Sequence, residues 1–139
     1  MDFLGLYKHS LDAKNRIFIP SKYREYLGGT FVICPGADKS LYVYSIEEWE
    51  KVAAQVKALG STPELRRYKR SFFERADMVE LDKQGRFTIK AELKEYAHLD
   101  KDIVIAGSGN KFEIWDAESY EEETRRTLSA DDLDIEVIF

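Results

Sequence analysis

The stretch Leu11-Asp-Ala-Lys-Asn-Arg-Ile-Phe-Ile-Pro-Ser-Lys-Tyr-Arg-Glu-Tyr26 occurs twice in this chain. Its second copy, offset by 70 residues, is Leu81-Asp-Lys-Gln-Gly-Arg-Phe-Thr-Ile-Lys-Ala-Glu-Leu-Lys-Glu-Tyr96, with six of the sixteen aligned residues identical. Downstream of each copy, two short apolar runs match in the same order: 31–34 with 103–106, and 41–44 with 112–115. A match of this length and order indicates that a unit of about 50 residues is present twice.

Each copy predicts the same order of short elements. A first strand ends at a turn, a second strand follows, and a helix of one or two turns comes next. Two more strands complete the unit. The expected ranges in the first copy are 7–11, 16–19, 21–27, 30–34 and 41–44. In the second copy they are 78–81, 86–89, 91–98, 103–106 and 112–115.

The turn has the pattern Asp-x-x-Asn-Arg over residues 12–16 and Asp-x-x-Gly-Arg over residues 82–86. Gly85 suits a backbone position with positive φ, and Asn15 is the best substitute for glycine there. The carboxylates of Asp12 and Asp82 can accept hydrogen bonds from backbone N–H groups two residues on. These four residues are therefore predicted to build the turns.

A helical hairpin is expected between the two units. Ser45 and Glu48 form a capping box that opens one helix, which ends before Gly60. Thr62 and Pro63 open a second helix that continues to Arg75. A unit with four short strands buries little core alone, whereas two units can share one.

The predicted fold class is therefore α+β and rich in β-structure, with two interlocked units that share a small β-barrel core. The helical hairpin connects the units, and the other helices lie outside. The expected segments are a first unit with its helix (1–60), a helical linker (61–76), a second unit (77–120) and an acidic C-terminal tail (121–139).

The chain has 139 residues and a formal charge of −5, which, taken alone, disfavours nucleic acid as a partner. Residues 116–139 contain nine acidic and two basic residues, a local charge of −7, so residues 1–115 carry −5 − (−7) = +2. No apolar run approaches the ~18 residues of a membrane helix. Met1–Gly5 lacks the features of a signal peptide, so a cytoplasmic location is expected.

The motifs indicate binding rather than catalysis. The sequence has no nucleophile elbow, phosphate loop or zinc-ligand spacing, and its two histidines occupy non-equivalent repeat positions. We therefore expect no enzyme activity, no metal site and no cofactor, and we expect Cys34 to be a buried small hydrophobic residue. The candidate binding residues are the cations of the two turns: Lys14, Arg16, Lys83 and Arg86. Such side chains can grip phosphates or guanine edges, but the arginines could equally serve only to hold their own turns.

The sequence resembles the MraZ family of bacterial transcriptional regulators over residues 1 to about 120. The resemblance rests on Ser10-Leu-Asp-Ala-Lys-Asn-Arg16 and on Glu80-Leu-Asp-Lys-Gln-Gly-Arg86. Further support comes from Phe3-Leu-Gly5, Leu41-Tyr-Val-Tyr44, Glu47-Glu-Trp49, Phe72-Phe73 and Phe112-Glu-Ile-Trp115. Two positions depart from the pattern: Asn15 replaces the usual glycine and could reshape the first turn, and Lys90 stands where the first copy has Pro20 and could alter the strand exit.

The resemblance implies an AbrB-like swapped-hairpin fold and a ring-shaped homo-oligomer. It implies sequence-specific binding of double-stranded DNA at short direct repeats in a promoter. The regulator would usually repress the division and cell-wall gene cluster that includes its own gene, and would be cytoplasmic and nucleoid-associated. By position, the DNA-contacting residues would be Lys14 and Arg16 in the first turn, and Arg86 with Lys83 in the second.

Two alternatives depend on the acidic tail, residues 121–139. The tail could dock a basic protein partner, which would make the chain an interaction scaffold. An antitoxin-type regulator of the AbrB-like kind is the other alternative, although such proteins usually carry one repeat rather than two.

Overall fold

The computed structural model describes residues 2–126 and residue 133. In the first half of the chain the elements are β1 (Leu6–Ser10), β2 (Arg16–Phe18), α1 (Ser21–Leu27), β3 (Thr30–Pro35), the short 3₁₀ helix η1 (Ala37–Lys39), β4 (Leu41–Ser45) and α2 (Ile46–Lys57). In the second half they are α3 (Pro63–Arg75), β5 (Asp77–Glu80), β6 (Arg86–Thr88), α4 (Ala91–Tyr96), β7 (Asp102–Gly107), β8 (Phe112–Asp116) and α5 (Ala117–Thr124). The predicted order of strands and helices from β1 to β8 is confirmed, except that η1 was not predicted from the sequence.

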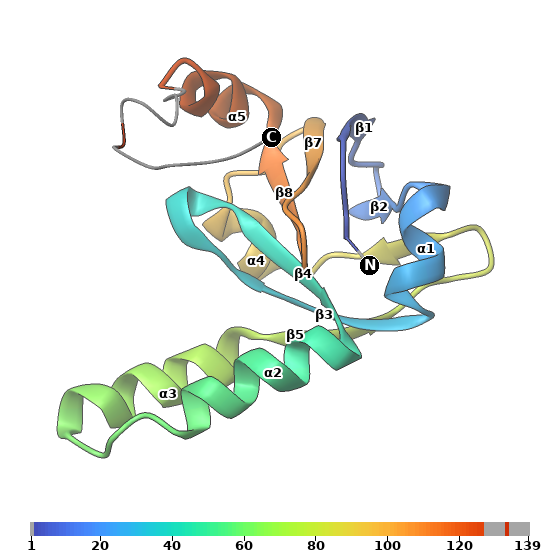
Figure 1. The fold of residues 1–139 in the computed structure, drawn as a ribbon. Coiled ribbons are helices and arrows are strands. Elements are labelled where there is room, and N and C mark those ends of the chain that lie inside the picture. Colours follow the sequence, from blue (N-terminus) through green and yellow to red (C-terminus); the bar gives the residue numbers. More distant parts are fainter. Residues whose placement is uncertain (1, 127–132, 134–139) are drawn as a thin grey trace.

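The strands form two antiparallel groups that mix the two repeats (Figure 1). A six-stranded sheet has the order β1-β7-β8-β4-β3-β5, and β2 pairs with β6 in a separate ribbon. In the sheet, β1 of the first repeat pairs with β7 of the second, and β5 of the second repeat pairs with β3 of the first. The repeats are therefore interlocked, as predicted, and neither has a complete set of strand partners without the other.

The expected closed barrel is not found among the described residues. After each turn the chain leaves the six-stranded sheet, because β2 pairs with β6 and not with β1. No ladder therefore joins the two edge strands, β1 and β5, in the described part of the chain. The correct description is a mixed α+β fold in which an open sheet and a two-stranded ribbon pack on one core.

The core lies between the sheet and the ribbon. Ile17 and Phe87, at the centre of the ribbon, are almost fully buried, and the Phe87 ring packs edge-on against Phe31 of β3 at 5.2 Å. Phe112 of β8, in the second repeat, packs against Tyr23 of α1, in the first repeat, with ring centroids 4.9 Å apart. Burial of Cys34, at 2% exposure, confirms its predicted role as a small core residue and raises the pKa of its thiol to about 12.

The predicted helical hairpin is confirmed as α2 and α3, which project from the body side by side (Figure 1). The Ser45 hydroxyl accepts a hydrogen bond from the Glu48 N–H, and Thr62 caps α3 through the Leu65 N–H. The Trp49 and Phe72 rings stack at 5.3 Å, which joins the two helices. Because α3 has no fully buried residue, it is held by partly exposed contacts.

The last helix of the described residues, α5, overlaps the start of the expected acidic tail. Asp116 caps α5 by accepting the Ser119 N–H, and this helix continues to Thr124, past the expected tail boundary at residue 120. The remainder of the expected tail, apart from residue 133, starts beyond Arg126 and lies outside the described residues. None of the helices in the described part of the chain is long and apolar enough to cross a bilayer.

Candidate functional site

Each turn has three loop residues, 13–15 in the first and 83–85 in the second, and the two turns make the same backbone hydrogen bonds. The Asn15 N–H donates to the Asp12 carbonyl at 3.0 Å, and the Gly85 N–H donates to the Asp82 carbonyl at 3.1 Å. The last loop residue has φ 59° in Asn15 and φ 81° in Gly85. This confirms the predicted left-handed positions, which such loops require. The substitution of asparagine for glycine therefore leaves the form of the first turn unchanged.

The second departure, Lys90 at the position equivalent to Pro20, does not change the backbone conformation either. Pro20, which precedes α1, has φ −52° and ψ 136°, and Lys90, which precedes α4, has φ −64° and ψ 144°. The two residues have similar φ and ψ, so each second strand leaves the ribbon in the same way. The strand exit, which Lys90 could have altered, is preserved.

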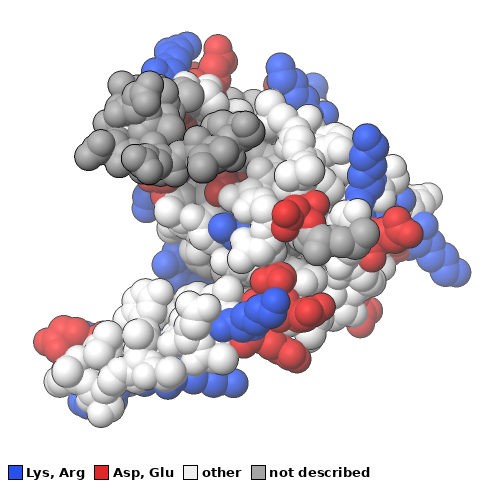
Figure 2. All heavy atoms as spheres, viewed as in Figure 1, with Lys and Arg blue, Asp and Glu red and all other residues white. Residues whose placement is uncertain are grey.

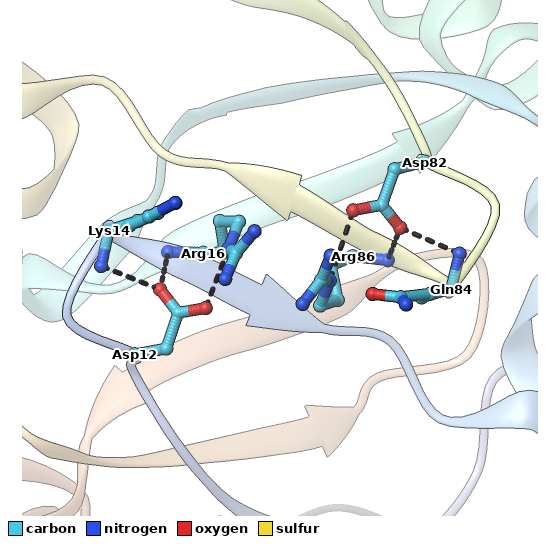
Figure 3. A network of polar contacts seen from close by, with 6 residues as sticks. All are labelled: Asp12, Lys14, Arg16, Asp82, Gln84 and Arg86. Atoms are coloured by element: carbon cyan, nitrogen blue, oxygen red, sulfur yellow. Dashed lines mark hydrogen bonds and ion pairs between the residues drawn. The ribbon is translucent and has the colours of Figure 1, made fainter.

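In each turn, the aspartate carboxylate accepts hydrogen bonds from N–H groups of the same turn (Figure 3). Asp12 Oδ1 accepts the N–H groups of Lys14 at 2.9 Å and Arg16 at 2.8 Å, and its Oδ2 accepts Arg16 Nε at 2.6 Å. In the second turn, Asp82 receives the equivalent bonds from Gln84 N–H, Arg86 N–H and Arg86 Nε at 2.9, 2.9 and 3.0 Å. The turn-building role predicted for both aspartates agrees with this geometry.

These bonds lower the pKa of both carboxyl groups. In each turn the largest cause is the backbone N–H of the arginine, Arg16 for Asp12 and Arg86 for Asp82. The charged form is favoured because a carboxylate accepts these bonds and a neutral carboxyl group accepts them less well. A depressed pKa in the folded state means that the stabilisation is present above the unfolded pKa, about 4, and is lost as pH falls through the folded value.

We therefore expect Asp82→Asn to lower the stability of the protein at pH 7 and to have little effect at pH 2. Urea unfolding of the wild type and the variant, followed by circular dichroism across this pH range, measures the difference. The control is Asp100→Asn, an exposed aspartate outside both turns. A stability difference that persisted unchanged at pH 2 would contradict the assigned bonding.

The two turns stand at opposite ends of the β2–β6 ribbon. Arg16 is paired with Thr88, and Phe18 with Arg86. The Ile19 N–H donates to the Gly85 carbonyl and the Ile89 N–H to the Asn15 carbonyl, both at 2.9 Å. The backbone hydrogen bonds between β2 and β6 thus continue into both turns, and this fixes the distance between the two turns.

One face of the ribbon is turned outward. Ile17 and Phe87 point to the core, so their neighbours on both strands share the opposite face. That face carries a square of four side chains: Arg16, Phe18, Arg86 and Thr88. The two arginines are diagonal neighbours in it, a spacing of about 7–8 Å between backbones. Figure 3 shows both of them over the ribbon, between the two aspartates.

The arginines keep donors free for a ligand. Each side chain is 28% exposed and uses Nε for its aspartate. Among the described residues, the terminal amino groups of both guanidinium groups have no hydrogen-bond partner. The alternative in which the arginines only hold their turns therefore accounts for one nitrogen of each fork. The remaining donors suit phosphate oxygens or the O6 and N7 atoms of guanine.

The two lysines add charge at different places. Lys14 is the second of the three loop residues in the first turn, whereas Lys83 is the first of the three in the second turn, and both are exposed. Gln84 and Ala13 occupy the corresponding places. The turns are thus alike in backbone and different in side chains.

Two cations near the turns were not singled out from the sequence. Arg24 of α1 packs against Gly85, and Lys94 of α4 donates a hydrogen bond to Asn15 Oδ1 at 2.9 Å. The sequence contained one indication of their role, because residues 24 and 94 are aligned in the repeat and both are basic. Only the folded structure shows that each contacts the turn of the other repeat.

The charges on the visible face are mixed in sign: Figure 2 shows basic and acidic side chains interspersed rather than one continuous basic area. Within the described ranges, no group of three or more His, Cys, Asp or Glu side chains is placed to hold a metal ion. The ribbon and its turns are therefore the candidate binding site.

Comparison with known proteins gives consistent matches. The family described as "MraZ protein, putative antitoxin-like" matches twice, over residues 3–71 and 72–134. The second match extends into the acidic end, beyond the limit of about residue 120 seen from the motifs.

Individual relatives match over most of their length. A transcriptional regulator MraZ from Acetivibrio thermocellus is 46% identical over 120 residues, covering 86% of this chain and 84% of the relative. The protein of the same name from Clostridium tetani is 45% identical, covering 86% and 85%. That from Desulfitobacterium hafniense is 41% identical, covering 92% and 90%. With both repeats matched and relatives at this level of identity, the chain belongs to the MraZ family.

Proposed function

We propose that this protein is a transcriptional regulator that binds double-stranded DNA in a sequence-specific manner. Its sites are short direct repeats in a promoter. It represses the division and cell-wall gene cluster that includes its own gene. The relatives that it matches bear the name transcriptional regulator, which supports the class of function.

The observation that carries the proposal is the outward face of the β2–β6 ribbon. A two-stranded ribbon fits the major groove of B-DNA. Here its exposed face presents Arg16 and Arg86, with Lys14 and Lys83 on the flanking turns. The arginine forks read base edges, and the lysines add contacts to phosphates.

We further propose that the chain works as a ring-shaped homo-oligomer with an AbrB-like swapped-hairpin unit as its building block. The interlocked pairing of β1 with β7 and of β5 with β3 supports this unit. Four cations per chain bind DNA weakly, but linked copies on direct repeats gain avidity of about 100-fold or more. The net charge of +2 on residues 1–115 supports DNA as the partner of this part of the chain.

Selection of genomic fragments on the purified protein, followed by sequencing, tests the proposal. The expected result is enrichment of one promoter that contains a short repeated motif. Retention of all fragments alike would contradict sequence-specific binding.

The affinity for the recovered duplex is expected to fall steeply with salt. Displacement of counterions by several sets of turn cations predicts a loss of at least ~100-fold between about 50 and 200 mM salt. Fluorescence anisotropy with the recovered duplex and a scrambled duplex measures this. A flat response, or equal affinity for the scrambled duplex, would count against the proposal.

A second candidate is an interaction scaffold or antitoxin-type regulator that acts through the acidic tail. Its supporting observation is the local charge of −7 over residues 116–139. Because α5 continues to Thr124, the deletion that tests it removes residues 127–139 and keeps the helix. Unchanged promoter binding after this deletion would assign the tail a separate role, and loss of binding would include the tail in DNA recognition.

A further inference from the structure

Each turn of the ribbon is supported by a cation from the other repeat. Arg24 belongs to α1 of the first repeat and lies against Gly85 of the second turn. Lys94 belongs to α4 of the second repeat and bonds to Asn15 of the first turn. The repeat offset of 70 relates both members of the two pairs, residue 24 to 94 and residue 15 to 85.

The contact between Arg24 and Gly85 leaves no room for a side chain at residue 85. A Cβ built on Gly85 would overlap the Arg24 guanidinium carbon. Two contacts hold Arg24 in this place: its Nε donates to the Ile19 carbonyl at 2.9 Å, and its guanidinium lies over the Phe18 ring at 4.5 Å. Gly85 therefore provides the space that Arg24 occupies as well as an unstrained positive φ.

In the first turn, different residues make the equivalent contact between the turn and a cation of the other repeat. Asn15 has a Cβ and a side-chain oxygen, and the cation that faces it is Lys94, whose ammonium group donates to that oxygen at 2.9 Å. The residue equivalent to Phe18 is Thr88, which offers no ring for a guanidinium group to stack on. Each turn thus has a matched set that joins the two repeats: Phe18, Arg24 and Gly85 at the second turn, and Thr88, Lys94 and Asn15 at the first.

We infer that Arg24 and Lys94 are positioning residues, and that each fixes the DNA-contacting turn of the opposite repeat through a pairing matched in size and hydrogen bonding. Gly85 precedes Arg86 and Asn15 precedes Arg16, so each supporting cation sets the place where a base-reading arginine leaves the turn. For its effect on DNA, the inference rests on the proposed function.

The test exchanges the members of one matched pair for those of the other. Gly85→Asn alone forces Arg24 out of its place, and we expect about tenfold weaker binding of the recovered duplex, the factor equivalent to one lost hydrogen bond. Adding Arg24→Lys supplies the partner that asparagine has in the first turn. The double variant is expected to recover most of the lost affinity.

Two further variants test the inference if Gly85→Asn fails to fold. Arg24→Ala removes the support without crowding the turn and should weaken binding by a similar factor. Lys22→Ala removes an exposed cation from the same helix and should weaken it much less. Urea unfolding of every variant shows whether a loss of affinity exceeds the loss of folded protein.

The outcomes separate this inference from the proposed function. If the wild type binds the duplex and the double variant is no better than Gly85→Asn, the matched pairing is wrong while DNA binding stands. If the wild type does not bind, the proposed function fails. In that case the urea midpoints of the same variants still test the pairing, which predicts that Arg24→Lys partly reverses the effect of Gly85→Asn. Additive midpoints would overturn it.

Discussion

Replacing Arg16 and Arg86 together with alanine is expected to reduce the affinity for the promoter duplex at least ~100-fold. Each well-placed arginine is worth about 1–3 kcal/mol of base discrimination, and both lie on one face of the ribbon. Anisotropy titrations of the wild type and the double variant measure the loss. The matched control removes two arginines from α3, Arg67 and Arg70, and should change the affinity far less.

The same double variant distinguishes the two roles considered for these arginines. Loss of binding with unchanged oligomer mass and unchanged urea midpoint assigns them to DNA. Arg16 and Arg86 also donate to Asp12 and Asp82, so some loss of stability is compatible with this role. Disassembly or unfolding without any specific loss of affinity would mean that the arginines only hold the turns.

Phe112→Ala is expected to destabilise the fold by about 3–5 kcal/mol, the usual cost of removing a fully buried phenylalanine ring. Phe112 has no exposed surface, and its ring packs against Tyr23 and, at 5.2 Å, against Phe3. The substitution thus loosens β8, α1 and the N-terminal segment together. Urea unfolding at fixed protein concentration measures the change in free energy.

Phe73→Ala is the control for this prediction, because the Phe73 side chain on α3 is 37% exposed. Its cost should be well below that of Phe112→Ala. Equal costs for the two substitutions would contradict the assignment of the core between the sheet and the ribbon.

The local features of the turns could be predicted from the sequence. Short-range chemistry determines them: the αL position selects Asn15 and Gly85, and a carboxylate within reach of nearby N–H groups selects Asp12 and Asp82. The helix over 21–27 was predicted with the bounds of α1, because Gly28, with φ 78°, ends it. The repeat then predicted that the two units interlock.

The features that were missed depend on contacts between distant residues. Whether β2 pairs with β1 or with β6 decides if the strands close into a barrel, and both pairings satisfy the same alternating pattern. The contact of Arg24 with Gly85 joins residues that lie far apart in the sequence. The alignment of two basic residues marked the positions, but only the interlocked fold shows that each reaches the opposite turn.

Photo-crosslinking from the turns tests whether the ribbon and its turns contact DNA. A photoreactive residue replaces Ala13 or Gln84, which are exposed in the two turns and carry no proposed contact, with Ser71 on α3 as the control position. We expect crosslinks to the promoter duplex from both turns and none from α3. Crosslinks from Ser71 with none from either turn would contradict it.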